Sequence, residues 1–243
     1  MRSIILAAGV GSRLKPLTDN SPKCLTEVNG KSILINMLNN LKNSGILQTR
    51  IVVGYLGKKI KERIGDNFKG MSIDYVKNKD YNKTNTSYSL LKGLKGLDEE
   101  ILILEGDIFF EEKLLREFLR TPYLNSTAVQ KYNPHLDGSF VEIKNNLVVD
   151  WIHKTARDSN FQIQDKYKTV NIHKFSADFV RTILKPGLEK HVNLSEGTEP
   201  LEYVMQDIVL KKIGIIHPFE VGSLKWFEID NIEDLKLSEK IFK

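Results

Sequence analysis

Short apolar runs alternate with stretches of helical periodicity over the first half of the chain. The apolar runs are bounded by turn residues and predict buried strands at 3–7, 50–54, 71–76 and 101–104. Apolar residues spaced three and four apart predict helices at 33–44, 58–64, 85–97 and 111–119. We expect Ser32 to be the N-cap of the first helix and Gly45 its C-cap. Strands that alternate with helices predict a parallel sheet covered by helices.

The second half of the chain has a looser pattern with shorter strands. These are expected at 127–130, 139–143, 147–151, 169–175, 214–219 and 226–230. Helices are expected at 177–184, at 199–212 and from Ile232 to the end of the sequence. We find no internal repeat, low-complexity tract or long linker. The pattern therefore predicts one α/β domain over residues 1–243, with a Rossmann-like, mixed and mainly parallel sheet.

Composition and charge narrow the function classes. Hydrophobic residues make up 41% of the chain and charged residues 28%, and no apolar run approaches the roughly 20 residues that span a membrane. The net charge of +5 is small and dispersed, which is unlike a nucleic-acid-binding surface and compatible with small anionic substrates. Cys24 is the only cysteine, so no intrachain disulfide can form. We therefore expect a cytoplasmic protein with neither a membrane nor a nucleic-acid partner.

A glycine-rich segment follows the first predicted strand: Leu6-Ala7-Ala8-Gly9-Val10-Gly11-Ser12-Arg13-Leu14. Small residues where a strand turns let backbone N–H groups approach a polyphosphate without obstruction by side chains. The carboxyl end of the first strand is also where ligands bind in an open α/β sheet. The segment lacks the Gly-Lys-Ser/Thr ending of a P-loop and the third glycine of a dinucleotide fingerprint. Taken alone, it is equally consistent with a turn that is glycine-rich for steric reasons.

The continuation Lys15-Pro16-Leu17-Thr18-Asp19-Asn20-Ser21-Pro22-Lys23-Cys24-Leu25 is more specific. The whole stretch from Leu6 resembles the signature of the sugar-nucleotide pyrophosphorylase superfamily, in which this loop wraps the triphosphate of an NTP. The resemblance implies catalytic, charge-neutralising roles for Arg13 and Lys23. It also implies that the triphosphate is bound by Leu6, Ala8, Gly9, Gly11 and Ser12. A surface position is the alternative for Lys23, although Pro22 fixes its backbone.

Acidic residues at two distant places are candidates for a magnesium site. Asp107 follows the aliphatic strand at 101–104, and Glu228 and Asp230 alternate in Trp226-Phe227-Glu228-Ile229-Asp230, which would place them on one face of a strand. Carboxylate oxygens are the ligands that Mg²⁺ prefers. The pair could instead be a solvent-facing strand edge, with Asp230 as a helix cap. Related cytidylyltransferases carry a similar acidic pair, and this resemblance implies Mg²⁺ binding by Asp107, Asp230 and Glu228.

Shorter segments resemble the parts of related cytidylyltransferases that bind the nucleobase and the acceptor. The segment 81–90 resembles the Asn-rich segment of phosphocholine-type cytidylyltransferases, which makes Asn85 and Ser87 candidates for substrate binding, with helix capping as the alternative. Lys154 lies where many relatives place a lysine that contacts phosphate. The runs 137–139 and 167–175 resemble 2-aminoethylphosphonate cytidylyltransferases, so Lys168 could meet a phosphonate and Asn171 the acceptor or ribose. Candidate neighbours for a cationic amine are Trp151, Glu202, Tyr203 and Trp226.

Together these features predict a fold of the nucleotide-diphospho-sugar transferase type. We expect the NTP over residues 1–120 and the acceptor over residues 121–243. The expected reaction transfers CMP from CTP to a small anionic acceptor, either 2-aminoethylphosphonate or phosphocholine, with Mg²⁺ as cofactor and a homodimer as a possible assembly. The alternatives are a hexose-1-phosphate uridylyl- or thymidylyltransferase and a noncatalytic nucleotide-binding regulatory subunit. The attacking phosphate or phosphonate is already ionised at neutral pH, so no dedicated general base is required.

Overall fold

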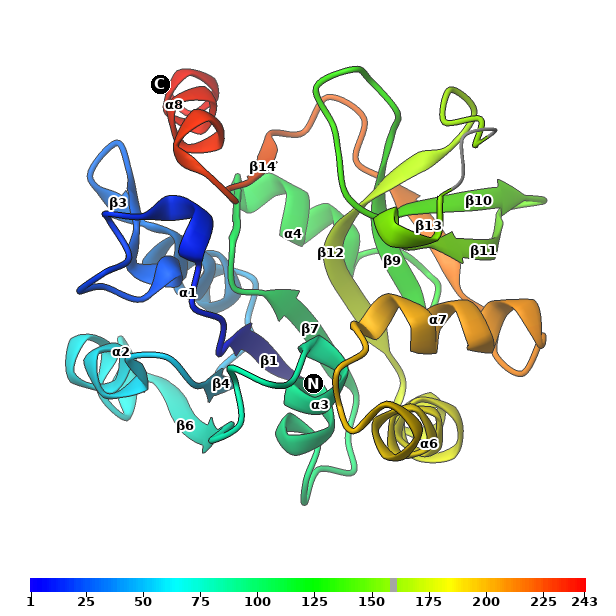
Figure 1. Ribbon diagram of the computed structural model, residues 1–243, viewed down its shortest axis with the longest axis horizontal. Helices are drawn as coiled ribbons and strands as arrows, with labels where there is room; N and C mark the ends of the chain where they lie inside the picture. Colours follow the sequence, from blue (N-terminus) through cyan, green and yellow to red (C-terminus); the bar gives the residue numbers. More distant parts are fainter. Residues whose placement is uncertain (158–160) are drawn as a thin grey trace.

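The structure is a computed structural model that describes residues 1–157 and 161–243. Over these residues, ten strands form one sheet in the order β11-β10-β12-β7-β1-β4-β6-β5, with β9 and β13 attached beside β12 (Figure 1). The four central strands are parallel: β7 (Ile101–Glu105), β1 (Arg2–Ala7), β4 (Gln48–Val53) and β6 (Met71–Lys77). These central strands carry the apolar runs on which the sequence-based prediction depended. β7, β1 and β4 are largely buried, and β6 is buried at Met71 and Ile73.

The outer strands make the sheet mixed. Antiparallel pairing adds β5 (Asn67–Phe68) at one edge and β12 (Tyr167–Phe175), β10 (Phe140–Lys144), β11 (Leu147–Ile152) and β9 (Ser126–Lys131) on the other side. β13 (His217–Glu220) pairs with β9 in parallel. The prediction of a single α/β domain with a mixed sheet and a parallel centre is confirmed.

The register of the central strands brings their carboxyl ends to one edge. Leu6 of β1 lies opposite Val52 of β4 on one side and Glu105 of β7 on the other. The loops that leave β1, β4 and β7 therefore start side by side. This is the edge at which open α/β sheets bind ligands.

Helices cover both faces of the sheet. α1 (Ile33–Asn43), α2 (Gly57–Ile64) and α4 (Glu112–Leu119) contribute to one hydrophobic cluster, and α3 (Thr86–Gly93), α6 (Lys185–Ser195) and α7 (Leu201–Leu210) contribute to the other. Figure 1 shows α1 and α4 on one side of the central strands and α3 and α6 on the opposite side. Ser32 caps α1 as predicted, since its hydroxyl accepts a hydrogen bond from Ile35 N at 3.3 Å.

Several short elements complete the chain. β2 (Glu27–Val28) pairs with β3 (Lys31–Ser32), and β8 (Ile108–Phe110) pairs with β14 (Trp226–Glu228), both outside the main sheet. Single 3₁₀ turns cover Ser12–Leu14, Lys23–Leu25 and Lys154–Ala156. The last helix is α8 (Ile232–Ile241). No helix in the described part of the chain is both long and apolar enough to cross a bilayer.

Two expectations need correction. The helix expected to end at Leu184 starts as α5 (Ala177–Phe179), passes through a π turn at Val180–Leu184 and continues as α6 to Ser195. Pro186 does not end it, because it lies in the first turn of α6, where a missing N–H is tolerated. Strand β14 ends at Glu228, so Asp230 lies beyond the strand rather than on one of its faces.

Candidate active site

The glycine loop after β1 is shaped by its contact with Lys23. Gly11 has a φ of 67°, in the left-handed region, and a Cβ at this position would lie 2.8 Å from the Cβ of Lys23. Glycine therefore satisfies the turn and the close approach together. The hydroxyl of Thr18 donates to the Gly11 carbonyl at 2.9 Å and holds the loop against the following segment. The stem of Lys23 consequently runs directly beneath the loop.

Lys23 joins carboxylates that are distant in the sequence. Its ammonium Nζ lies 2.7 Å from Asp107 Oδ2 and 2.7 Å from Asp230 Oδ1, and Arg13 reaches the other oxygen of Asp230 at 2.8 Å. Burial alone would lower the pKa of Lys23, but the charges of Asp107 and Asp230 outweigh burial and raise it above its ordinary value. Burial would likewise raise the pKa of Asp230, and Lys23 and Arg13 hold it below its usual range. Lys23 and Asp230 are therefore both charged at neutral pH.

Backbone pairing between two short strands brings the carboxylates together. Glu228 of β14 lies opposite Ile108 of β8, and Ile229 N donates to the Asp107 carbonyl at 3.0 Å. Asp230 follows immediately, at the start of α8, where its backbone N–H donates to Asp234. The sequence suggested an alternating strand face. In the structure, Asp230 is instead held by the hydrogen bond from the neighbouring Ile229 N to Asp107 and by its own hydrogen bond to Asp234 at the start of α8.

Two adjoining cavities open at this edge of the sheet. The first, here called the loop cavity, has a volume of about 350 Å³ and is lined by Leu6, Ala7, Gly9, Gly11, Ser12, Arg13, Lys23, Cys24, Asn85, Thr86, Glu105, Gly106, Asp107 and Asp230. The second, here called the carboxylate cavity, has a volume of about 330 Å³ and lies over the second half of the chain. Its lining shares Arg13, Asn85, Thr86, Glu105, Asp107 and Asp230 with the loop cavity and adds His135, Leu136, Asp137, Gly138, Ser139, His153, Lys154, Lys168, Asn171, Pro200, Glu202, Trp226, Phe227, Glu228, Asn231 and Asp234. Arg13, Asp107 and Asp230 therefore stand at the junction of the two spaces.

Most of the residues predicted from the sequence line one of these cavities. Ala8 and Ser87 do not. Ala8 packs beneath the loop, where its carbonyl accepts a hydrogen bond from Tyr55 N at 3.0 Å. Ser87 is fully buried, and its hydroxyl donates to the Glu199 carbonyl, so the structure gives it a role in packing α3 against the segment before α7.

Asn85 combines its two predicted roles. Its side chain accepts a hydrogen bond from Thr86 N at 2.8 Å, which makes it the N-cap of α3, and it also lines both cavities. Of the candidate neighbours for an amine, Glu202 and Trp226 line the carboxylate cavity. Trp151 is a core residue with 1% of its surface exposed. The hydroxyl of Tyr203 bonds to Thr155 at 3.0 Å, outside the cavity lining.

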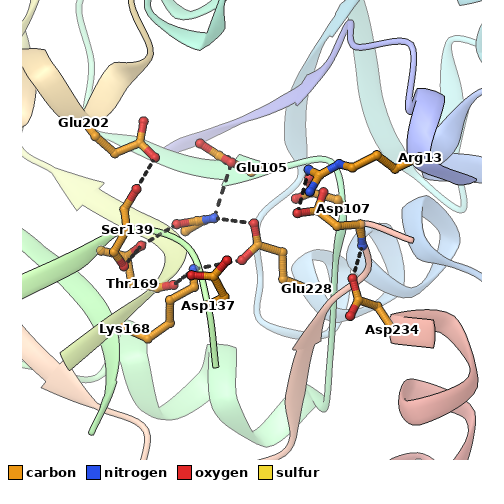
Figure 2. Close-up of polar contacts among 12 residues, drawn as sticks. Arg13, Glu105, Asp107, Asp137, Ser139, Lys168, Thr169, Glu202, Glu228 and Asp234 are labelled. Atoms are coloured by element: carbon orange, nitrogen blue, oxygen red, sulfur yellow. Dashed lines mark hydrogen bonds and ion pairs between the residues drawn. The ribbon is translucent and has the colours of Figure 1, made fainter. Parts of the chain in front are cut away.

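Lys168 and Asn171 are buried and line the carboxylate cavity. Figure 2 shows Lys168 beside Glu228. The ammonium of Lys168 lies 2.8 Å from Glu228 Oε2 and donates to the Thr169 carbonyl at 2.8 Å. The amide of Asn171 donates to Glu105 at 3.3 Å and to Glu228 at 3.5 Å. Both predicted residues therefore organise carboxylates, and both line the cavity.

Glu105 was not selected from the sequence, although it lies two residues before Asp107. Its carboxyl lines both cavities, and its pKa is raised well above the usual range, first by burial and then by the negative charge of Glu202. Burial also raises the pKa of Glu228, against the attraction of Lys168. Glu105 could have been identified from the sequence, because it lies at the carboxyl end of a predicted central strand.

The carboxylates fit a divalent cation. Asp107, Glu228 and Asp230 each offer one oxygen that lies within 4.8 Å of the other two. Asp107 Oδ1 is buried and has no hydrogen-bond partner among the described residues, which is costly for a carboxylate oxygen unless it meets a ligand. A donor set made only of carboxylate oxygens suits Mg²⁺.

Comparison with known proteins agrees with this geometry. A profile of the family described as nucleotidyl transferase matches residues 2–128, more than half of the chain. The chain belongs to the nucleotidyl transferase family. The predicted superfamily and the predicted enzyme class are therefore confirmed at the level of the family.

Several relatives carry names that refer to CMP or CTP. The chain is 28% identical over 240 residues to a CMP-5'-(3-aminopropyl)phosphonate synthase of Streptomyces rubellomurinus, which covers 98% of this chain but only 38% of the relative. It is 27% identical over 257 residues to a CTP:phosphoglutamine cytidylyltransferase of Campylobacter jejuni, with 98% of each chain covered. A choline-phosphate cytidylyltransferase of Streptococcus pneumoniae is 34% identical over 128 residues, which cover 51% of this chain and 53% of the relative.

Solved structures share the fold. The CTP:phosphocholine cytidylyltransferase of Streptococcus pneumoniae superposes with a TM-score of 0.80 at 24% identity and covers 100% of this chain and 99% of its own. A putative glucose-1-phosphate thymidylyltransferase from Bacillus anthracis superposes with a TM-score of 0.78 at 18% identity, with 99% and 94% covered. Since enzymes named for different nucleotides and acceptors share this architecture, the fold does not select the substrate.

Proposed function

We propose that this protein is a cytidylyltransferase that moves CMP from CTP to a small phosphate or phosphonate acceptor and releases pyrophosphate. The observation that carries the proposal is the junction of the two cavities, where Lys23 and Arg13 meet Asp107 and Asp230. A transfer reaction needs two substrates on either side of one reacting phosphorus, and two adjoining spaces that share charged walls suit this requirement. The relatives named as cytidylyltransferases support the choice of CTP.

The loop cavity would hold the nucleotide triphosphate. Gly9, Gly11 and Ser12 line it, and backbone N–H groups of a glycine loop at the end of β1 are expected to bind phosphate oxygens. Lys23 and Arg13 would offset the charge that grows on the departing pyrophosphate. Asn85, at the shared wall, remains our candidate for contact with the nucleoside.

Asp107, Glu228 and Asp230 would hold Mg²⁺, which supplies electrostatic stabilisation to the phosphate oxygens during transfer. The residues of the chain provide the rest of the site. Lys23 and Arg13 orient the carboxylates of Asp107 and Asp230, and the backbone pairing of β8 with β14 keeps these carboxylates close. Catalysis would thus depend on position and charge rather than on a general base.

The carboxylate cavity would hold the acceptor. Lys154 and Arg13 line it and can attract an anionic phosphate or phosphonate toward the junction. This assignment retains the division expected from the sequence, with the nucleotide over residues 1–120 and the acceptor over residues 121–243. The single, buried Cys24 agrees with the reducing cytoplasm that we include in the proposal.

A substrate matrix tests the proposal. CTP, UTP, dTTP and ATP are each combined with 2-aminoethylphosphonate, phosphocholine and glucose 1-phosphate, with Mg²⁺, and pyrophosphate release is measured. We expect release with CTP and one of the nitrogen-containing acceptors. Release with UTP or dTTP and glucose 1-phosphate would replace the proposal with a hexose-1-phosphate nucleotidyltransferase. Nucleotide binding without any release would favour a noncatalytic subunit.

A further inference from the structure

The lining of the carboxylate cavity has more acidic than basic side chains. Seven carboxylates line it against three lysine or arginine side chains, although the whole chain has a net charge of +5. A cavity proposed to receive an anionic acceptor would be expected to be positive. The surplus therefore calls for positive partners, and the described residues show which carboxylates already have one.

Three of the seven carboxylates have a cation at the reaction end of the cavity. Asp107 and Asp230 share the ammonium of Lys23, at 2.7 Å from each. Glu228 pairs with the buried ammonium of Lys168 at 2.8 Å. In the proposed function these same three carboxylates also meet the metal ion. These three carboxylates therefore have a positive partner both without the metal ion and, in the proposed function, with it.

Two more carboxylates have partners close by. Asp137 pairs with the guanidinium of Arg157 at 3.2 Å. Asp234 accepts hydrogen bonds from two backbone N–H groups at the start of α8, at 2.9 and 3.1 Å. Glu105 and Glu202 remain. Among the residues that the structure describes, neither of them forms an ion pair with a lysine, arginine or histidine side chain.

Neutral donors hold these two carboxylates in place. Ser139 Oγ donates to Glu202 Oε1 at 2.7 Å, and Asn171 Nδ2 donates to Glu105 Oε2 at 3.3 Å. Figure 2 shows Glu202 and Arg13 on opposite sides of the group, with Glu105 between them in this view. An acceptor whose phosphate or phosphonate faces Arg13 would therefore direct its other end toward Glu105 and Glu202.

The lining of this end distinguishes between kinds of cation. A primary ammonium donates three hydrogen bonds, and carboxylate oxygens are strong acceptors for them. A quaternary ammonium donates none and is recognised by open aromatic faces. Trp226 is only 7% exposed and already has the ammonium of Lys168 5.9 Å from its ring. Phe227, its neighbour on β14, is the other aromatic side chain of the Trp, Tyr or Phe type in the lining.

We propose that Glu202 and Glu105 form an ammonium subsite that selects acceptors with a primary amine over acceptors with a quaternary ammonium or with no amine. The inference rests on the proposed function, because it assumes that the acceptor enters the carboxylate cavity with its anionic group toward Arg13. It goes further by naming the residues that choose the acceptor. It also separates 2-aminoethylphosphonate from phosphocholine on chemical grounds.

The test compares 2-aminoethylphosphonate, ethylphosphonate and phosphocholine as acceptors with CTP, and measures kcat/KM from pyrophosphate release. For the unaltered protein we expect the primary amine to be favoured at least tenfold over each of the others. Glu202→Gln, which keeps the shape and the bond from Ser139, should lower kcat/KM for 2-aminoethylphosphonate about 10- to 100-fold, as expected for a lost charge-assisted hydrogen bond. The value for ethylphosphonate should change less than threefold. Glu105→Gln is the second variant, and Glu220→Gln, on an exposed part of β13, is the control.

Calorimetric binding of the same three compounds separates this inference from the proposed function. If no acceptor releases pyrophosphate, the proposed function fails. Tighter binding of 2-aminoethylphosphonate than of ethylphosphonate, lost in Glu202→Gln, would then still support the ammonium subsite. Equal binding of the three compounds, tighter binding of phosphocholine, or an amine preference that survives in both glutamine variants would overturn it.

Discussion

Replacement of Lys23 by methionine should affect metal binding and catalysis in opposite directions. The ammonium of Lys23 lies 2.7 Å from both Asp107 Oδ2 and Asp230 Oδ1, the same two side chains that we propose as metal ligands. In the absence of nucleotide it therefore competes with a divalent cation for the same oxygens. Methionine keeps much of the side-chain volume but leaves the two carboxylates without this partner.

The magnitude follows from Coulomb's law and from exposure. Two unit charges about 4 Å apart interact by roughly 4 kcal/mol at an effective dielectric constant of 20. The side chains of Lys23 and Asp230 are 15% and 24% exposed, so solvent screens part of this energy. We take about 1.4 to 2.8 kcal/mol as the remainder, which is about a 10- to 100-fold gain in metal affinity. Catalysis should fall about 10²- to 10³-fold in kcat/KM, because the variant loses one stabilising charge on the departing pyrophosphate.

The assay titrates nucleotide-free protein with Mn²⁺ by calorimetry and measures pyrophosphate release with saturating Mg²⁺. Lys15→Met is the matched control, since Lys15 lies in the same loop but forms an exposed pair with Asp19 at 3.2 Å. It should change neither quantity by more than about twofold, in line with the small effect of an exposed ion pair. Unchanged or weaker Mn²⁺ binding by Lys23→Met would refute the competition, and an unchanged kcat/KM would remove Lys23 from the site.

Three further predictions concern other parts of the molecule. Asp107→Asn should lower pyrophosphate release by about 10²-fold or more, because metal stabilisation contributes several kcal/mol, while circular dichroism stays unchanged. Burial lowers the pKa of His173 from 6.5 to about 3 in the folded protein. As the pH is lowered through 6.5, the unfolded chain therefore binds a proton that the folded protein does not bind, and the free energy of unfolding decreases. At pH 5 the expected decrease is about 2 kcal/mol. Urea unfolding should show that this decrease is absent in His173→Phe and still present in His135→Phe, a control at an exposed position. Gly138→Ala should cost about 1 to 3 kcal/mol by urea unfolding, since φ is 116° and the new Cβ would lie 2.7 Å from Lys168 Cε.

The sequence predicted the sheet well where local signals and tertiary packing agree. The runs at 50–54 and 101–104 are aliphatic and bounded by turn residues, and they form β4 and β7. The signal failed at Pro186, where the sequence favours a helix end but the preceding π turn allows the chain to continue as α6. A rule about single residues cannot detect this, because tolerance of proline depends on where the helix starts.

A long contiguous signature drew attention to the basic residues at the junction of the two cavities. Arg13 and Lys23 both belong to the stretch from Leu6 to Leu25, and the structure brings them to Asp107 and Asp230. The acceptor end was harder to predict. Glu202 was among the candidate neighbours for an amine, but Glu105 was not selected, and the two residues come from separate elements, the first turn of α7 and a central strand. Only the fold shows that they face one cavity.

A backbone irregularity lies in the wall of the carboxylate cavity. β12 pairs with β9 at Thr169 and again from His173, with a register shift between them, and Asn171 has a φ of 61° in that interval. Asparagine is among the few residues that adopt this left-handed conformation readily. The shift breaks the regular alternation of the strand at the point where the Asn171 amide bonds to both Glu105 and Glu228. One irregular residue therefore links the proposed ammonium subsite to a proposed metal ligand. If both proposals hold, a substitution at Asn171 should affect acceptor choice and metal binding together.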